Sequence, residues 1–319
     1  MQLGSTLGAN LVCGSIVAIL YGAMCLQCYS YFQRAHKTRS RFLGYSVLLL
    51  WALGTAHMVF VECDMYLNLV ANFGDVEKVL NVTFWPTPAL EVITLVTTLF
   101  VQSWYCHRLW VLSSKNALLT YFLIVVIFAS FSLGMASVIE IVMLKNFANF
   151  HAVVWMSLAC VSLTTFADFY ISSALCYFIY KERKYVRSRM GSLLNTIIVY
   201  TVSINLITGL VSVSYIITNF LLPDTWVYVG EYMIFCGLYC NSLLAWINAR
   251  DSVRERLDCP TTGVAATVSP SSVMFAPAPA SRSRSVPIDT ISIVRAESTR
   301  SERSHENFDE KSTIRFSAV

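Results

Sequence analysis

Long apolar runs, separated by short polar segments, dominate the first 250 residues of the chain. Seven runs approach or exceed the roughly 20 residues that an α-helix needs to cross about 30 Å of hydrocarbon. They cover residues 7–32, 42–63, 89–112, 118–144, 152–180, 192–222 and 226–249. The pattern predicts an all-α fold, a bundle of seven transmembrane helices over residues 1–249.

Composition supports a membrane protein. Of the 319 residues, 56% are hydrophobic and 13% are charged, and the mean hydropathy is +0.59. Soluble domains usually carry about 25% charged residues. No basic segment precedes the first apolar run, so we expect no cleaved signal peptide. We expect the lipid bilayer to be the main partner, and we expect no nucleic acid among the partners.

The basic residues predict the orientation. Of the 23 Lys and Arg residues, 21 lie in or beside the first, third and fifth connections and the C-terminal tail. The positive-inside rule then places the N-terminus outside and the tail in the cytoplasm. The chain's single glycosylation sequon, at Asn81, falls in a connection that this orientation puts outside. The plasma membrane is the expected location, with other endomembranes as the alternative.

The composition changes after the last apolar run. Residues 250–259 begin with the amphipathic segment "RDSVRERLD", which is predicted to lie along the membrane surface. This segment leads to Cys259, a candidate for palmitoylation. Residues 260–319 are rich in Ser, Pro and Arg and poor in large apolar residues, which predicts a disordered tail. Serines beside arginines in this tail suggest kinases and cytoplasmic signalling proteins as partners.

Polar residues inside the apolar runs form a candidate intramembrane site. Asp168 stands near the middle of "LTTFADFYISSALCYFI", where a carboxylate costs roughly 2.5–3.5 kcal/mol and needs a partner. In one interpretation it bonds to a polar group of a neighbouring helix, such as Gln102 or Asn205. In the other it lines a polar cavity and binds a cation or a proton. The remaining candidates are His57, about 10 Å from Asp168 in predicted depth, and Asn241.

Glutamates gather at the predicted outer ends of the helices. They are Glu62, Glu91, Glu140 and Glu231. They form a candidate acidic vestibule that would concentrate cationic or small-molecule ligands. The alternative is that they are simply what a positive-inside charge distribution leaves on the outer side.

Motifs of known enzymes do not occur in the sequence. There is no Gly-x-Ser-x-Gly, no glycine-rich phosphate loop and no HExxH. Most of the ten cysteines lie within apolar runs, which is typical of core residues. We therefore expect no enzymatic activity, no catalytic or metal site and no cofactor. The outside N-terminus suggests a G-protein-coupled receptor, but the third run lacks Asp/Glu-Arg-Tyr and the seventh lacks Asn-Pro-x-x-Tyr.

Several motifs together resemble one family. They are "LGANLVCGSIVAILYGAMCLQCYSYF", "LLLWALGTAH", "VQSWYCHRLWVLS", "ADFYISSALCYFI" and "LYCNSLLAWINAR". In this order they are similar to a large fungal, chiefly basidiomycete, family of seven-helix membrane proteins known as a domain of unknown function. The resemblance covers residues 7–255 and implies a seven-helix fold and a fungal source, without an activity. Ala174 stands where the family usually has serine.

Three functions remain open from the sequence. A receptor-like sensor is favoured by the topology, the acidic outer ends and the Ser/Arg-rich tail. The alternative is a small-solute or proton-coupled transporter that uses Asp168. A lipid-interacting structural protein is the third.

Overall fold

The computed structural model describes residues 3–33, 41–75, 78, 84–113, 116–144, 151–183, 207–222, 225 and 227–258. The chain divides into two units, Met1–Arg254 and Glu255–Val319. Of the second unit, only residues 255–258 are described. The predicted palmitoylation site at Cys259, the tail and the sequon at Asn81 lie outside the described residues.

Within the described ranges the structure is helical, with no strand. Six helices are long and apolar enough to cross a membrane, so the chain is a multi-pass integral membrane protein. They are α1 (Leu3–Gln33), α2 (Arg41–Tyr66), α4 (Pro86–Leu112), α5 (Ala117–Leu144), α6 (His151–Arg183) and α8 (Val227–Asp258). A π-helical segment, η1 (Leu67–Ala71), continues α2. The all-α prediction is confirmed.

The predicted sixth span is only partly described. The sequence predicts a helix over residues 192–222, and the structure describes a shorter apolar helix over Ile207–Leu221. Residues 192–206 lie outside the described ranges. The count of seven membrane crossings therefore stays a prediction.

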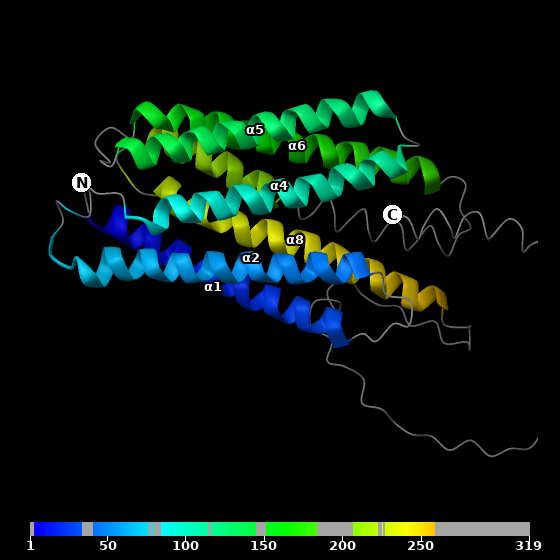
Figure 1. Cartoon of the computed structure of the whole chain (residues 1–319), viewed down its shortest axis with the longest axis horizontal. Helices are drawn as coiled ribbons and strands as arrows, with labels where there is room; N and C mark the ends of the chain where they lie inside the picture. Colours follow the sequence, from blue (N-terminus) through cyan, green and yellow to red (C-terminus); the bar gives the residue numbers. More distant parts are fainter. Residues whose placement is uncertain are drawn as a thin grey trace, which may run out of the picture. The chain divides into compact units, whose positions relative to one another are not determined.

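Helices that follow one another in the chain pack side by side. The main contacts join α1 to α2, α2 to α4, α4 to α5 and α5 to α6, and α4 also contacts α6 (Figure 1). We call the end of this bundle at which α1 begins and α2 ends end I. The opposite end, at which α1 ends and α2 begins, is end II.

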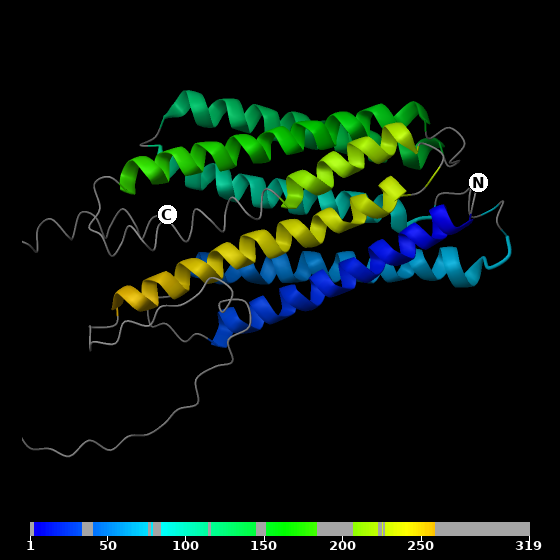
Figure 2. The same ribbon diagram turned by 180° about the vertical axis from the view of Figure 1, so that it is seen from behind.

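Helix α8 occupies the interior of the bundle. Figures 1 and 2 show it crossing between the helices on either side. In the most apolar stretch of its membrane segment, Val227–Arg250, 61% of the residues are buried, a larger share than in any of the other five long helices. A close approach to α1 requires Gly237, because a Cβ atom there would lie 3.1 Å from the Leu20 Cβ. The helix therefore contacts most of its neighbours at once.

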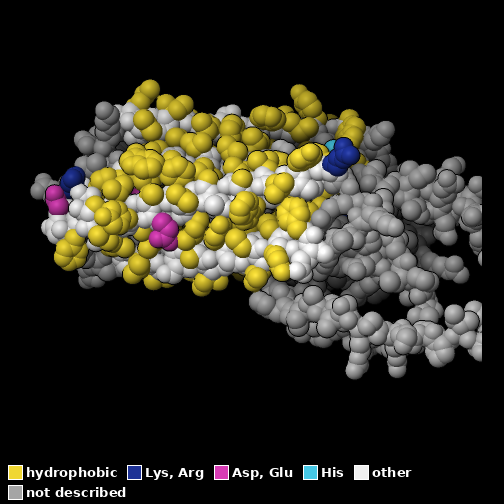
Figure 3. Space-filling view, turned by 60° about the horizontal axis from the view of Figure 1, so that its bottom comes forward, with side chains coloured by type: hydrophobic (Ala, Val, Ile, Leu, Met, Phe, Trp, Pro, Cys, Tyr) yellow, Lys and Arg dark blue, Asp and Glu magenta, His cyan; other side chains and the backbone are white. Residues whose placement is uncertain are grey.

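The outer surface matches a lipid environment. Large apolar side chains point outward along the helices, among them Ile19 and Leu118, which are 71% and 83% exposed. Figure 3 shows hydrophobic side chains covering most of one face, with the basic side chains near its ends. In lipid this surface is buried by acyl chains, and the helices satisfy their own backbone hydrogen bonds.

Candidate functional site

Asp168 joins three helices. From α6, its Oδ1 accepts a hydrogen bond of 2.9 Å from Gln102 Nε2 on α4. Its Oδ2 accepts one of 2.6 Å from the Tyr239 hydroxyl on α8. We call these three residues the Asp168 cluster. It includes one residue that the sequence had suggested as a partner, Gln102, and one that it had not, Tyr239.

The Asp168 cluster is closed to its surroundings. Asp168, Gln102 and Tyr239 are 6%, 2% and 3% exposed. The Gln102 amide also donates to the Thr164 carbonyl of α6 at 3.3 Å. Hydrogen bonds to a charged acceptor are shorter and stronger than neutral ones, so a carboxylate with two donors is well held here. The arrangement fits a polar link between α4, α6 and α8.

Tyr239 belongs to a regular stripe on α8. Along this helix, buried and half-buried aromatic and polar side chains recur at alternating steps of four and three residues, which places them on one helix face. The stripe consists of Tyr228, Tyr232, Phe235, Tyr239, Ser242 and Trp246. This spacing is visible in the sequence and was the signal that could have identified Tyr239.

A second polar cluster lies between α4 and α8, nearer to end II. The Arg108 guanidinium of α4 lies over the Trp246 ring of α8, with Cζ 4.2 Å from the ring centroid. Trp104 packs edge-on against Trp246, with ring centroids 4.9 Å apart. Arg108 is only 4% exposed, yet its Nε and Nη1 have no hydrogen-bond partner. We call Arg108, Trp104 and Trp246 the Arg108 cluster.

The other predicted intramembrane candidates do not bond to Asp168 in the described structure. His57 of α2 is 1% exposed, and its Nε2 has no hydrogen-bond partner. Asn241 accepts a bond of 3.2 Å from Gln27 and donates one of 2.9 Å to the Leu20 carbonyl, so it ties α8 to α1. Asn205 lies outside the described residues.

The four glutamates of the predicted vestibule have separate surroundings. Glu91 accepts a bond of 3.2 Å from Ser137 of α5. Glu62 is exposed on α2, and Glu140 is half-buried on α5. Glu231 differs from these three, because it faces a cavity.

The cavity beside Glu231 lies toward end I, between α1, the helix Ile207–Leu221 and α8. Its volume is about 650 Å³. The Glu231 carboxylate accepts bonds from the hydroxyls of Ser214, at 2.6 Å, and Thr218, at 2.7 Å. The lining residues are Gly8, Ala9, Val12, Cys13, Ile16, Val211, Ser214, Val227, Glu231 and Ile234. It is an apolar space with a single carboxylate.

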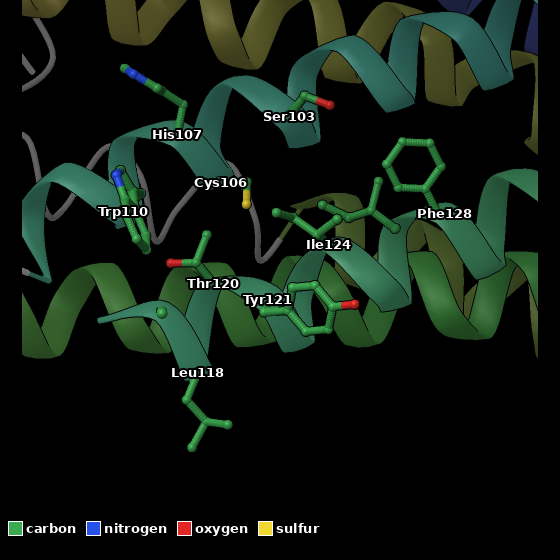
Figure 4. A pocket seen from close by; sticks show the side chains of 11 residues that line it. Ser103, Cys106, His107, Trp110, Leu118, Thr120, Tyr121, Ile124 and Phe128 are labelled. Carbon is green, nitrogen blue, oxygen red and sulfur yellow. The ribbon is translucent and has the colours of Figure 1, made fainter. Parts of the chain in front are cut away.

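A second cavity of about 920 Å³ lies between α4 and α5 near end II. Figure 4 shows Trp110, Thr120, Tyr121 and Ile124 around it, with His107 directed away. Its walls are mostly apolar, as expected for a groove that faces lipid. Asp168 lines neither this cavity nor the one beside Glu231.

A further buried acid lies in the last turn of α2. Asp64 is only 1% exposed. Its two oxygens accept bonds from Thr87, at 2.8 Å, and Asn68, at 3.1 Å. The separation of four residues between Asp64 and Asn68 was the available signal. These bonds hold the last turn of α2 to the start of α4.

No group of three His, Cys, Asp or Glu side chains suited to a metal ion occurs in the part of the chain that the structure describes. The described cysteines are free, and most are buried. We take the Asp168 cluster, the Arg108 cluster and the cavity beside Glu231 as the candidate sites.

Comparison with known proteins gives one partial match. Curated proteins give no match, and neither do solved structures. A family of unknown function (DUF6534) matches residues 164–252. The matched segment contains Asp168, Glu231, Tyr239 and Trp246, whereas Gln102 and Arg108 precede it. Over this segment the chain is similar to a family whose function is unknown.

Proposed function

We propose that this protein is a receptor-like membrane sensor in which α8 connects a ligand cavity near end I to end II. The observation that carries the proposal is the distribution of polar contacts along α8. Glu231 lines the cavity, Tyr239 binds Asp168, and Trp246 lies beneath Arg108. At 1.5 Å per residue, the steps between these α8 residues are about 12 and 10 Å.

The cavity beside Glu231 suits a small amphipathic cation. Nine of its ten lining residues are uncharged and most are apolar, which favours an apolar body. A carboxylate in such surroundings favours an amine or another cationic group. Ligand binding would compete with Ser214 and Thr218 for the Glu231 oxygens, and would therefore change how α8 sits against the helix Ile207–Leu221.

Helix α8 is suited to carry this change. It contacts α1 through Asn241, α6 through Asp168 and α4 through Trp104. Packed helices that can adopt two arrangements convert a small shift at one site into a discrete change at another. The Asp168 cluster defines one arrangement, and a shift of α8 would break the Tyr239 bond and move Trp246 relative to Arg108.

The proposal includes the predicted topology of seven crossings, with end I outside and the tail in the cytoplasm of a fungal plasma membrane. Asn81 would then carry a glycan. Endoglycosidase treatment should increase the mobility of the wild type and leave Asn81→Gln unchanged. Protease access to the tail in sealed, right-side-out cells would contradict this orientation. Cytoplasmic kinases would phosphorylate the tail, or signalling proteins would bind it.

The transporter alternative has less support. Transport through Asp168 requires an accessible carboxylate, whereas both of its oxygens accept hydrogen bonds and it lines neither of the two cavities. A purely structural role would account for the Asp168 cluster, but not for a cavity with a carboxylate. No enzymatic activity and no cofactor form part of the proposal.

The sensor is tested with the full chain in lipid nanodiscs. Dodecylamine serves as the probe, and dodecanol, which has the same apolar chain without a cation, serves as its control. Dodecylamine should raise the melting temperature and change tryptophan emission, and Trp246→Phe should remove most of the emission change. Glu231→Gln should lose both effects, and Asp168→Asn should keep binding and lose the emission change.

Glu62→Gln is the matched control, because Glu62 lies toward the same end but is exposed on α2. It should respond like the wild type. Equal responses of Glu231→Gln and the wild type would contradict the sensor. Solute flux into proteoliposomes that disappears in Asp168→Asn would establish the transporter instead.

A further inference from the structure

Arg108 is a buried cation without a counter-charge among the residues that the structure describes. Its side chain is 96% buried, with 4% exposure, and Nε and Nη1 have no hydrogen-bond partner. The Trp246 ring covers one side of the guanidinium at 4.2 Å. A stacked aromatic ring attracts a cation but accepts no in-plane hydrogen bond, so the donor edge of Arg108 stays unsatisfied.

A second cation, on α8, interacts electrostatically with Arg108. Arg250 of α8 lies close enough to Arg108 to repel it electrostatically, and the other interacting groups are Tyr105 and Cys176. Among the described carboxylates, Asp168 is already occupied by Gln102 and Tyr239. A buried cation that lacks a partner costs free energy, and a second cation nearby increases that cost. An anion placed at the donor edge would remove both costs.

We propose that Arg108 and Arg250 form an anion-binding site at end II that takes a phosphate group. The guanidinium fork presents parallel N–H donors that match two oxygens of a phosphate, and Trp246 holds the fork in place. Arg108 lies one turn before the end of α4, and Arg250 closes the membrane segment of α8. Both therefore lie near the depth of lipid headgroups, where basic sites between helices bind phosphates.

The phosphate group could come from a phosphomonoester lipid or from free phosphate in solution, and the experiment distinguishes the two. The full chain is purified into nanodiscs of phosphatidylcholine alone, and its melting temperature is measured with and without inorganic phosphate. A parallel sample contains phosphatidylcholine with phosphatidic acid. An anion at about 100 times its Kd should raise the melting temperature by roughly 5–10 °C. A rise with phosphatidic acid alone assigns the site to lipid, and a rise with both assigns it to the phosphate ion.

Two substitutions decide whether Arg108 is responsible. Arg108→Met keeps much of the side-chain volume and removes the cation, so it should abolish the rise. Without added anion it should melt no lower than the wild type, because it removes an uncompensated charge. Arg250→Gln should weaken anion binding about tenfold or more. Lys181→Met is the control, since Lys181 is exposed near the same end, and it should keep the full rise.

Two results would overturn the site. One is a wild type whose melting temperature does not respond to either anion. The other is an Arg108→Met variant that melts well below the wild type in every lipid, which would show an internal counter-charge in place of an external anion. If Arg108→Met does not fold at all, Arg250→Gln with an unchanged anion response would also reject the proposal.

Discussion

The Asp168 cluster and the Arg108 cluster share α4 and α8 but differ in how their charges are compensated. Gln102 and Arg108 are six residues apart on α4, or about 9 Å along the helix. The carboxylate of Asp168 has a donor for each oxygen, whereas Arg108 has a tryptophan face and unpaired N–H groups. A buried charge with hydrogen-bond partners stabilises one arrangement of the helices, whereas a buried charge without them favours the binding of a ligand.

The difference also distinguishes what each region does in the bundle. The Asp168 cluster fixes the relative positions of α4, α6 and α8. The Arg108 cluster joins only α4 and α8, and the Nε and Nη1 donors of Arg108 have no acceptor in it. Substitutions in the first region should therefore change stability most, and substitutions in the second should change ligand dependence most.

Asp168→Leu should have the largest effect. It leaves the Gln102 amide and the Tyr239 hydroxyl buried without an acceptor, at about 1–3 kcal/mol each, so we expect a loss of about 2–5 kcal/mol. Reversible SDS unfolding in bicelles measures the free energy of unfolding. Asp168→Asn, which keeps an acceptor oxygen, is the control and should lose less. Equal stability of Asp168→Leu and the wild type would show that the cluster does not hold the helices.

Tyr239→Phe should lose about 1–2 kcal/mol, because it removes one donor to a buried carboxylate and keeps the ring. A double-mutant cycle with Asp168→Asn measures the coupling between the two groups, expected at about 0.5–2 kcal/mol. Tyr232→Phe is the matched control on the same stripe of α8. Additive losses in the Asp168 and Tyr239 variants would indicate that the 2.6 Å bond contributes nothing.

Trp246→Phe should lose about 1 kcal/mol. The smaller ring keeps an apolar contact with Trp104 but weakens the cation–π attraction to Arg108. The same substitution in an Arg108→Met background should cost less, since no cation remains. Thermal unfolding in nanodiscs measures both. An equal loss in the two backgrounds would mean that Trp246 acts by packing alone.

Glu231→Gln should have the smallest effect on stability, within about 0.5–1 kcal/mol, because an amide oxygen still accepts a bond from Ser214 or Thr218. Its effect should appear in amine binding instead. A loss of unfolding free energy above about 2 kcal/mol in the absence of ligand would mean that Glu231, like Asp168, mainly stabilises the packing of the helices.

Part of the candidate site could be predicted from the sequence. The cost of a carboxylate in lipid indicated that Asp168 needed a partner, and the polar groups Gln102 and Asn205 were the candidates. Tyr239 was missed because a tyrosine in an apolar helix has no unusual cost, although its place in the α8 stripe was readable. The burial of Asp64 does not follow from hydropathy, which shows a charge near a helix end but not the contact that Thr87 makes with it from α4.

Helices and their membrane character follow from the sequence alone, since runs of about 20 apolar residues can satisfy their backbone in lipid only as helices. Which side chains meet inside the bundle was decided only by the tertiary structure. The apolar surfaces of membrane helices are nearly interchangeable, so close packing and hydrogen bonds select the partners. Those choices depend on the rotation and crossing of α4, α6 and α8, which no local pattern specifies. The contrast between a paired Asp168 and an unpaired Arg108 exists only once these helices are placed together.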